Sequence, residues 1–128
     1  MKKLIFNGQN LSLNDIVLAA RGYVKDGHHL YPELKLSPVI SELLQKFREA
    51  LEGRMAAGDI IYGVNTGCGI KKATIIPDNE IKAYQKHYIP AHCVAVGDYF
   101  PEEITRAAMV LRLNSFTFGH SGVRLELC

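Results

Sequence analysis

The chain has 128 residues, 48% of them hydrophobic, which is enough to form one domain with a buried core and leaves no room for two. Its 15 basic and 13 acidic residues are interspersed and leave a net charge of +2, so no basic stripe indicates a nucleic acid partner. The apolar runs are too short for a membrane-spanning helix or a signal peptide, and we expect a cytoplasmic protein with no membrane partner.

The first predicted elements are a short strand near residues 3–6 and a helix near residues 12–20. Ser12 and Asp15 have the spacing of a capping box, and Gly22 follows the last apolar position, so the helix is bounded at both ends. We expect it to bury an apolar stripe formed by Leu13, Ile16, Val17 and Ala20.

Residues 22–37 are predicted to form a loop, because they contain Gly27, Pro32 and other turn-forming residues. A second helix is predicted near residues 38–52, with Pro38 at its first position, where a missing N–H is tolerated. Its apolar residues recur at helical spacing, and they are Val39, Ile40, Leu43, Leu44, Phe47, Ala50 and Leu51.

A second short strand is predicted near residues 59–62, and a third helix near residues 79–89, which Pro90 should bend or interrupt. A fourth helix, near residues 101–118, opens on acidic side chains that suit its positive end. Its expected buried face is formed by Ile104, Ala107, Ala108, Leu111, Ser115 and Phe118. The fold class is therefore expected to be mainly α.

The last residues, from Ser121, resemble the capped start of a further helix that has only one or two turns before the sequence stops. A helix that short is marginal, so we expect the sequence to be cut off within an element. Residues 1–128 are accordingly predicted to be a single, truncated domain.

Tyr62 stands at the start of a glycine-rich loop. The loop residues that we single out are Gly63, Asn65, Thr66, Gly67 and Gly69. Glycines adopt positive φ angles readily, so Tyr62 lies where a fixed segment meets a movable one, and its phenol could be delivered to a substrate. It could act as a base near neutral pH only in surroundings that favour the phenolate. The alternative is a turn tyrosine that packs on the core.

The three cysteines, Cys68, Cys93 and Cys128, are odd in number and lack a CxxC spacing, so we predict free thiols. His87 and His92 are five residues apart, which rotates them away from a shared helical face, and no metal site is predicted.

Several segments resemble the histidine and aromatic amino acid ammonia-lyases. Residues 62–69, Tyr-Gly-Val-Asn-Thr-Gly-Cys-Gly, are similar to the YGxNTGFG motif of that family. Gln85 and Ala91-His92 resemble its LQxxLxxSHAxGxG segment, and residues 101–124 resemble its PEEVxRAxMLLRxNSLxxGxSGVR segment. The similarity runs in one order over nearly the whole chain.

The resemblance implies elimination of ammonia from a small α-amino acid substrate, which leaves an unsaturated acid such as urocanate or cinnamate. It makes Tyr62 the base that takes the weakly acidic β proton, a transfer that needs a positioned base in a dry site. It also implies a methylidene-imidazolone cofactor formed from an internal Ala-Ser-Gly. Members of the family are largely helical homotetramers whose active sites draw on more than one subunit.

The resemblance also places substrate selection at Ala91-His92. Histidine lyases carry Ser-His there, tyrosine-directed lyases His-Leu and phenylalanine-directed lyases Phe-Leu. His92 therefore favours an imidazole substrate, since two imidazoles can share a hydrogen bond from donor to acceptor. The alternative is a partly buried structural histidine.

Two residues depart from the family pattern, because Cys68 replaces Phe and Ala91 replaces Ser. The chain contains no Ala-Ser-Gly, so we expect it to be inactive alone. Our prediction is the N-terminal part of a histidine ammonia-lyase-like enzyme. One alternative is a fragment of a phenylalanine or tyrosine ammonia-lyase or aminomutase. Another is a non-catalytic truncated paralogue that acts as an interaction module. Exposed apolar surface on the second and fourth helices would favour the interaction module.

Overall fold

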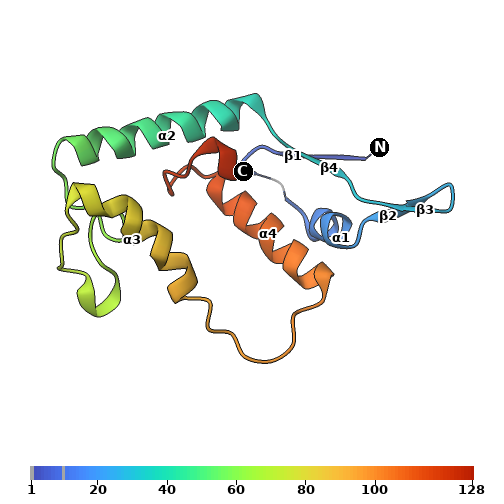
Figure 1. Ribbon diagram of the computed structural model, residues 1–128. Coiled ribbons are helices and arrows are strands. Elements are labelled where there is room, and N and C mark those ends of the chain that lie inside the picture. The colour runs from blue at the N-terminus through green and yellow to red at the C-terminus, as the bar shows by residue number, and fades with distance from the viewer. Residues whose placement is uncertain (1, 10) are drawn as a thin grey trace. The chain divides into compact units, whose positions relative to one another are not determined.

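The computed structural model describes residues 2–9 and 11–128, and about half of the chain is helical. Within these residues the elements run in the order β1 (Lys3–Phe6), α1 (Leu13–Arg21), β2 (Tyr23–Lys25), β3 (His28–Leu30), β4 (Glu33–Leu36), α2 (Pro38–Ala56), α3 (Asp78–Ala91) and α4 (Glu102–Phe116), with 3-10 turns at Gly69–Lys71 and Leu125–Leu127 (Figure 1). They belong to two compact units, of which unit 1 comprises Met1–Ala50 and Tyr99–Cys128 and unit 2 comprises Leu51–Asp98. The expected mainly α fold class is confirmed.

The core of unit 1 is formed by β1, α1 and α4. Its buried cluster consists of Leu4, Phe6, Ala19 and Val110. Leu4 and Phe6 alternate along β1 with exposed neighbours, so one face of the strand is buried. β4 runs parallel to β1, as Figure 1 shows, and a parallel pair needs a crossover connection, which here contains α1.

Residues 22–37 are not the loop that the sequence predicts. β2 and β3 form an antiparallel hairpin around Asp26 and Gly27, whose φ angles of 51° and 77° are typical of a two-residue hairpin turn. The two strands are three residues long each, too short for an alternating pattern to indicate them. β4 depends on pairing with β1, which is distant in sequence.

The strand predicted near residues 59–62 is absent from the structure's described elements. The Asn65 side chain accepts a hydrogen bond from the Ile61 N–H (2.7 Å) and donates one to the Asp59 carbonyl (2.8 Å), so it takes the place of a partner strand. The further helix predicted from Ser121 is also wrong, because Leu125–Leu127 form a single 3-10 turn instead.

The buried face of α4 differs from the prediction. Val110 is buried in the core, whereas Ile104 and Leu111, both assigned to the buried face, are 47% and 49% exposed. α4 carries apolar side chains on more than one face, so helical spacing alone cannot decide which face packs on α1. None of the helices in the described residues is long and apolar enough to cross a membrane.

The capping box predicted at the start of α1 is confirmed. The Asp15 N–H donates to Ser12 Oγ (3.2 Å), and the Ser12 N–H donates to the Asp15 carboxylate (2.9 Å). Hydrogen bonds from the Ser12 side chain and backbone lower the pKa of the Asp15 carboxyl below its usual 3.8. The helix therefore begins with two of its free N–H groups bonded.

We expect Ser12→Ala to lower the free energy of unfolding by about 1 kcal/mol, because the Asp15 N–H loses its capping oxygen. The contribution of Asp15 is present above the unfolded carboxyl pKa of 3.8 and is lost as the pH falls through the lower folded value. Urea unfolding at neutral pH and at about pH 2 measures both effects. Asn14→Ala, an exposed position in the same helix, is the control, and equal losses in the two variants would contradict the capping role.

Candidate functional site

The loop of unit 2 begins with a turn that carries Tyr62. The N–H groups of Val64 and Asn65 both donate to the Ile61 carbonyl, at 3.1 and 3.2 Å. The Asn65 side chain holds Ile61 and the preceding Asp59 through the two bonds described above. Asn65 therefore fixes the backbone on the N-terminal side of Tyr62.

Thr66 and Gly67 close the loop on its other side. Thr66 is buried, and its Oγ1 accepts from the Gly63 N–H (3.1 Å) and donates to the Gly67 carbonyl (2.8 Å). Thr66 also forms a backbone bridge with Ile75, and the Gly67 N–H donates to the Thr74 carbonyl at 2.9 Å. The two sides of the loop are thus bonded to each other, and Tyr62 stands on an ordered turn.

Gly67 leaves no room for a side chain. A Cβ atom built there would lie 2.6 Å from the Lys71 carbonyl oxygen, much closer than carbon and oxygen atoms approach without a bond. The close approach of these two backbone segments therefore requires glycine at this position.

The Tyr62 side chain lies on the outside of its loop. It is 64% exposed, and its Oη accepts a hydrogen bond from the Gly69 N–H at 3.2 Å. Gly69 has a φ of 58°, a left-handed conformation that glycine adopts without strain, and this conformation presents the N–H to the phenol. Tyr62 does not pack into a core within this chain, which was the alternative for a turn tyrosine.

α3 carries a row of ring side chains toward its C-terminal end. The ring centroids of Tyr84 and Tyr88 are 5.8 Å apart, and those of Tyr88 and His92 are 4.3 Å apart. α3 continues through Pro90 to Ala91 rather than being interrupted before it, and His92 is its C-cap. His92 therefore extends the row by one helical turn.

A backbone contact sets the tautomer of His92. Its Nδ1 lies 2.7 Å from the Tyr88 carbonyl oxygen, and a carbonyl can only accept a hydrogen bond. Nδ1 therefore carries the hydrogen, and Nε2 of the neutral ring bears a lone pair. Because His92 is exposed within this chain, that lone pair can accept a hydrogen bond from a ligand.

Cys68 links the tyrosine loop to the row of rings on α3. Its hydrogen bond with the phenol, together with partial loss of solvent, raises the pKa of Tyr88 to about 12. Loss of solvent and then the charge of Cys68 raise the pKa of Tyr84, and Tyr62 contributes to both shifts. Tyr84, Tyr88 and His92 form the row of rings, and Tyr62 and Cys68 act on its two phenols; we call these five side chains of unit 2 the phenol cluster.

We expect Cys68→Ala to lower the pKa of Tyr88 from about 12 toward the ordinary tyrosine value, because the phenol loses its bond to the sulfur. Absorbance titration of phenolate formation, with Tyr88→Phe as the subtraction, measures the change. All three cysteines are free thiols, as predicted. Cys93→Ala is the control, since the side chain of Cys93, just after α3, bonds only to the Ile89 carbonyl among the contacts described. An unchanged Tyr88 titration in Cys68→Ala would contradict this account.

The sequence analysis did not identify Tyr84 or Tyr88 as parts of a site, although their spacing of four residues is the signal for one row on a helix. It also did not identify the role of Gln85. The Gln85 Nε2 donates to the Gly63 carbonyl (2.9 Å) and the Val64 carbonyl (3.1 Å). These partners lie more than twenty residues upstream, so no local pattern could indicate the contact.

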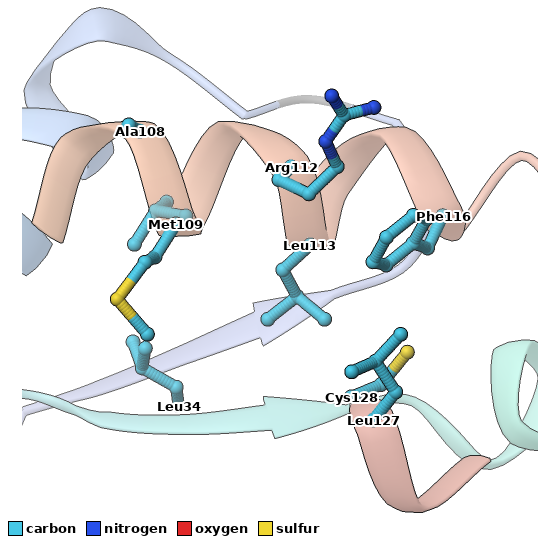
Figure 2. Close-up of a pocket in the computed structure, with 9 residues that line it drawn as sticks. Leu34, Ala108, Met109, Arg112, Leu113, Phe116, Leu127 and Cys128 are labelled. Atoms are coloured by element: carbon cyan, nitrogen blue, oxygen red, sulfur yellow. The ribbon is translucent and has the colours of Figure 1, made fainter. Parts of the chain in front are cut away.

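One hollow lies at the edge of the phenol cluster, and a hollow of similar volume lies outside it. One, of about 620 Å³ in unit 2, lies between the loop and α3 and is lined by Tyr84 but not by Tyr62 or His92. The other, of about 560 Å³ in unit 1, is lined mostly by apolar side chains of α4, and Figure 2 shows Arg112 pointing away from it. Among the described residues, no group of three or more His, Cys, Asp or Glu side chains could hold a metal ion.

Comparisons with known proteins agree with the resemblance of the tyrosine loop. The family model described as aromatic amino acid lyase matches residues 11–128. The chain is 39% identical over 126 residues to a histidine ammonia-lyase of Caldanaerobacter subterraneus subsp. tengcongensis, which is 98% of this chain and 23% of that protein. A histidine ammonia-lyase of Rattus norvegicus is 29% identical over 125 residues, with 98% and 18% covered.

Solved structures give the same result. The ergothioneine degrading enzyme ergothionase from Treponema denticola superposes with a TM-score of 0.88 at 32% identity, over 98% of this chain and 24% of that chain. A tyrosine aminomutase from Streptomyces globisporus superposes with a TM-score of 0.84 at 26% identity, over 95% and 22%. The chain thus spans about a quarter of the length of the relatives that it matches. With nearly all of its residues covered by the family model, the chain belongs to the aromatic amino acid lyase family.

Proposed function

We propose that this chain acts as the N-terminal part of a histidine ammonia-lyase-like enzyme, which eliminates ammonia from L-histidine to give urocanate. The observation that supports this proposal is the phenol cluster, in which Tyr62, on an ordered turn, acts electrostatically on the row of α3 rings that ends at His92. The complete enzyme is proposed to be a homotetramer, as its family resemblance implies, and to be cytoplasmic.

In the proposed reaction Tyr62 is the base that takes the β proton of the substrate. The Gly69 N–H that donates to Tyr62 Oη would stabilise a phenolate oxygen more strongly than a phenol oxygen. The pKa values of Tyr84 and Tyr88 are raised above the ordinary tyrosine value, so both phenols carry no charge at neutral pH and add no negative charge that would oppose a Tyr62 phenolate. The other residues of the tyrosine loop, Gly63, Asn65, Thr66, Gly67 and Gly69, serve to hold Tyr62 in place.

His92 is proposed to select the substrate. Its Nε2 lone pair can accept the N–H of a substrate imidazole, whereas a phenylalanine ring offers no donor. A histidine substrate would therefore gain a hydrogen bond that phenylalanine lacks, and a site built for such a bond rejects an analogue without it.

The methylidene-imidazolone of the family does not fit this chain by itself. The 128 residues contain no Ala-Ser-Gly from which the group could form, and the phenol cluster offers no substitute electrophile. We therefore propose that the isolated chain does not turn over histidine.

A chimera tests the proposal. The chain replaces the matching 126 residues of the Caldanaerobacter histidine ammonia-lyase, and the intact relative is the reference. We expect release of ammonia and formation of urocanate from histidine, with lower kcat/KM for phenylalanine and tyrosine. A chimera that assembles like the relative but turns over none of these substrates would overturn the proposal.

A second candidate within the family is a lyase or aminomutase for another substrate, which the tyrosine aminomutase and ergothionase structures favour. The His92 Nε2 can also accept a hydrogen bond from a tyrosine hydroxyl, so the same geometry suits a tyrosine substrate. The substrate panel therefore includes tyrosine and ergothioneine, and a preference for either replaces histidine as the assigned substrate.

A third candidate, from another class, is an interaction module without catalysis. Exposed apolar side chains on α2 and α4 favour it, among them Val39 (73% exposed), Met109 (67%) and Leu111 (49%). The Met109 side chain also lines the hollow of unit 1 in Figure 2. Size-exclusion chromatography of the chain, alone and mixed with the intact relative, tests this candidate. An interaction module predicts two results together: a stable complex with the relative, and a chimera without activity.

A further inference from the structure

We propose that Gln85 is a positioning residue for the reaction, and that its amide holds the turn carrying Tyr62 at a fixed distance from His92. This inference rests on the proposed function, because it concerns how the base and the selector of that reaction are held together. Gln85 touches neither Tyr62 Oη nor His92 among the contacts described, so its action would be indirect.

The contact uses the full donor capacity of the amide. The Nε2 of Gln85 has two hydrogens, and it lies 2.9 Å from the Gly63 carbonyl oxygen and 3.1 Å from the Val64 carbonyl oxygen. Both partners can only accept, so the nitrogen rather than the oxygen of the amide must face them. A carboxylate of the same length at this position would face two carbonyl oxygens with no hydrogen to share.

The two carbonyls belong to the residues directly after Tyr62. Asn65 bonds the backbone before Tyr62, and the Thr66–Ile75 bridge bonds the loop to itself. Neither of these contacts reaches α3. Gln85 therefore supplies a direct attachment of the base-bearing turn to the helix that ends at His92.

Helix geometry converts that attachment into a fixed spacing. Gln85 and His92 are seven residues apart, which is close to two helical turns, so they project from nearly the same face about 10 Å apart along the axis. Because an α-helix hardly changes its length, a turn that is attached to Gln85 also stays at a fixed distance from His92.

The inference predicts different kinetic effects at Gln85 and His92. Displacing the base slows proton transfer without removing a substrate contact, so a Gln85 variant should lose kcat and keep its KM. A His92 variant should instead raise KM for histidine, since it removes a contact that is already made when the substrate binds. A purely structural role for Gln85 would predict neither this separation nor a change confined to the loop.

The experiment uses the active chimera with Gln85→Leu, which removes both donors, and Gln85→Glu, which keeps the length. Lys86→Leu, an exposed position one residue further on, is the matched control. We expect both Gln85 variants to lose about tenfold or more in kcat with KM changed by less than about twofold. The deuterium isotope effect for β-deuterated histidine should increase, because proton transfer becomes the slower step.

Amide hydrogen exchange separates this inference from the proposed function. Residues 62–66 should exchange about tenfold faster in Gln85→Leu than in the parent, while the rest of α3 and the Lys86→Leu control stay as protected as before. Unchanged exchange and unchanged kcat in Gln85→Leu overturn the inference, and so does faster exchange throughout unit 2, which would indicate general destabilisation. An inactive parent chimera overturns the proposed function, whereas the exchange comparison in that same protein still decides whether Gln85 holds the turn.

Discussion

Tyr62→Phe is expected to lower kcat of the chimera for histidine by about 10²- to 10⁴-fold, the range that a positioned general base contributes. The substitution removes the oxygen that would take the β proton and leaves the ring in place. KM should change little, because Tyr62 is proposed to act on a proton and not to bind the amino acid. Steady-state assay of urocanate formation measures both constants.

Tyr99→Phe is the control for this experiment, because Tyr99 is fully exposed and lies in unit 1, outside the phenol cluster. It should keep the kcat of the parent. The Tyr62→Phe protein must also retain the α-helical content of the parent, so that loss of folding does not mimic loss of the base. Parental turnover in a folded Tyr62→Phe protein would remove Tyr62 from the role of base.

The second large effect concerns stability, and Phe6→Ala should lower the free energy of unfolding by about 3–5 kcal/mol. Phe6 is 2% exposed and belongs to the core cluster that joins β1, α1 and α4. Removing its ring leaves a cavity among side chains that can close only partly around it. Since a domain of this size is stable by only about 5–15 kcal/mol, the loss should be evident in urea unfolding at neutral pH.

Ile5→Ala is the matched control for Phe6→Ala. Ile5 is the preceding residue of the same strand, but it points to the opposite face and is 58% exposed. We expect Ile5→Ala to lower the free energy of unfolding by less than about half of the loss caused by Phe6→Ala. Equal losses at the two positions would mean that the core of unit 1 is not where the structure has it.

The helices could be predicted because their signals are local. Ser12 and Asp15 bond to each other across one turn, and Pro38 begins α2 at the position where its missing N–H is harmless. The signals for β4 and for the buried face of α4 are not local. β4 needs β1 beside it, and Val110 is buried because α1 covers that face.

The candidate site divides in the same way. A motif of adjacent residues indicated Tyr62 and its glycines, and a second motif indicated His92; the roles assigned to them stay predictions. The contacts that join the two motifs could not be predicted, because Gln85 reaches a turn more than twenty residues upstream and Cys68 reaches Tyr88 on another element. Side-chain contacts of this kind follow from the packing of the loop on α3 and leave no periodic pattern in the sequence.

The division of the chain into units has a consequence for its synthesis. Unit 2 is one continuous stretch, whereas unit 1 joins Met1–Ala50 to Tyr99–Cys128. On the ribosome, β1 and α1 emerge early, but the core cluster cannot close until Val110 has been made. Translation adds about 5–20 residues per second, so Leu4 and Phe6 stay exposed for several seconds before Val110 has been made. By then the segment with Tyr62 and His92 is already complete. During translation, Leu4 and Phe6 of β1 therefore stay exposed until α4 has been made.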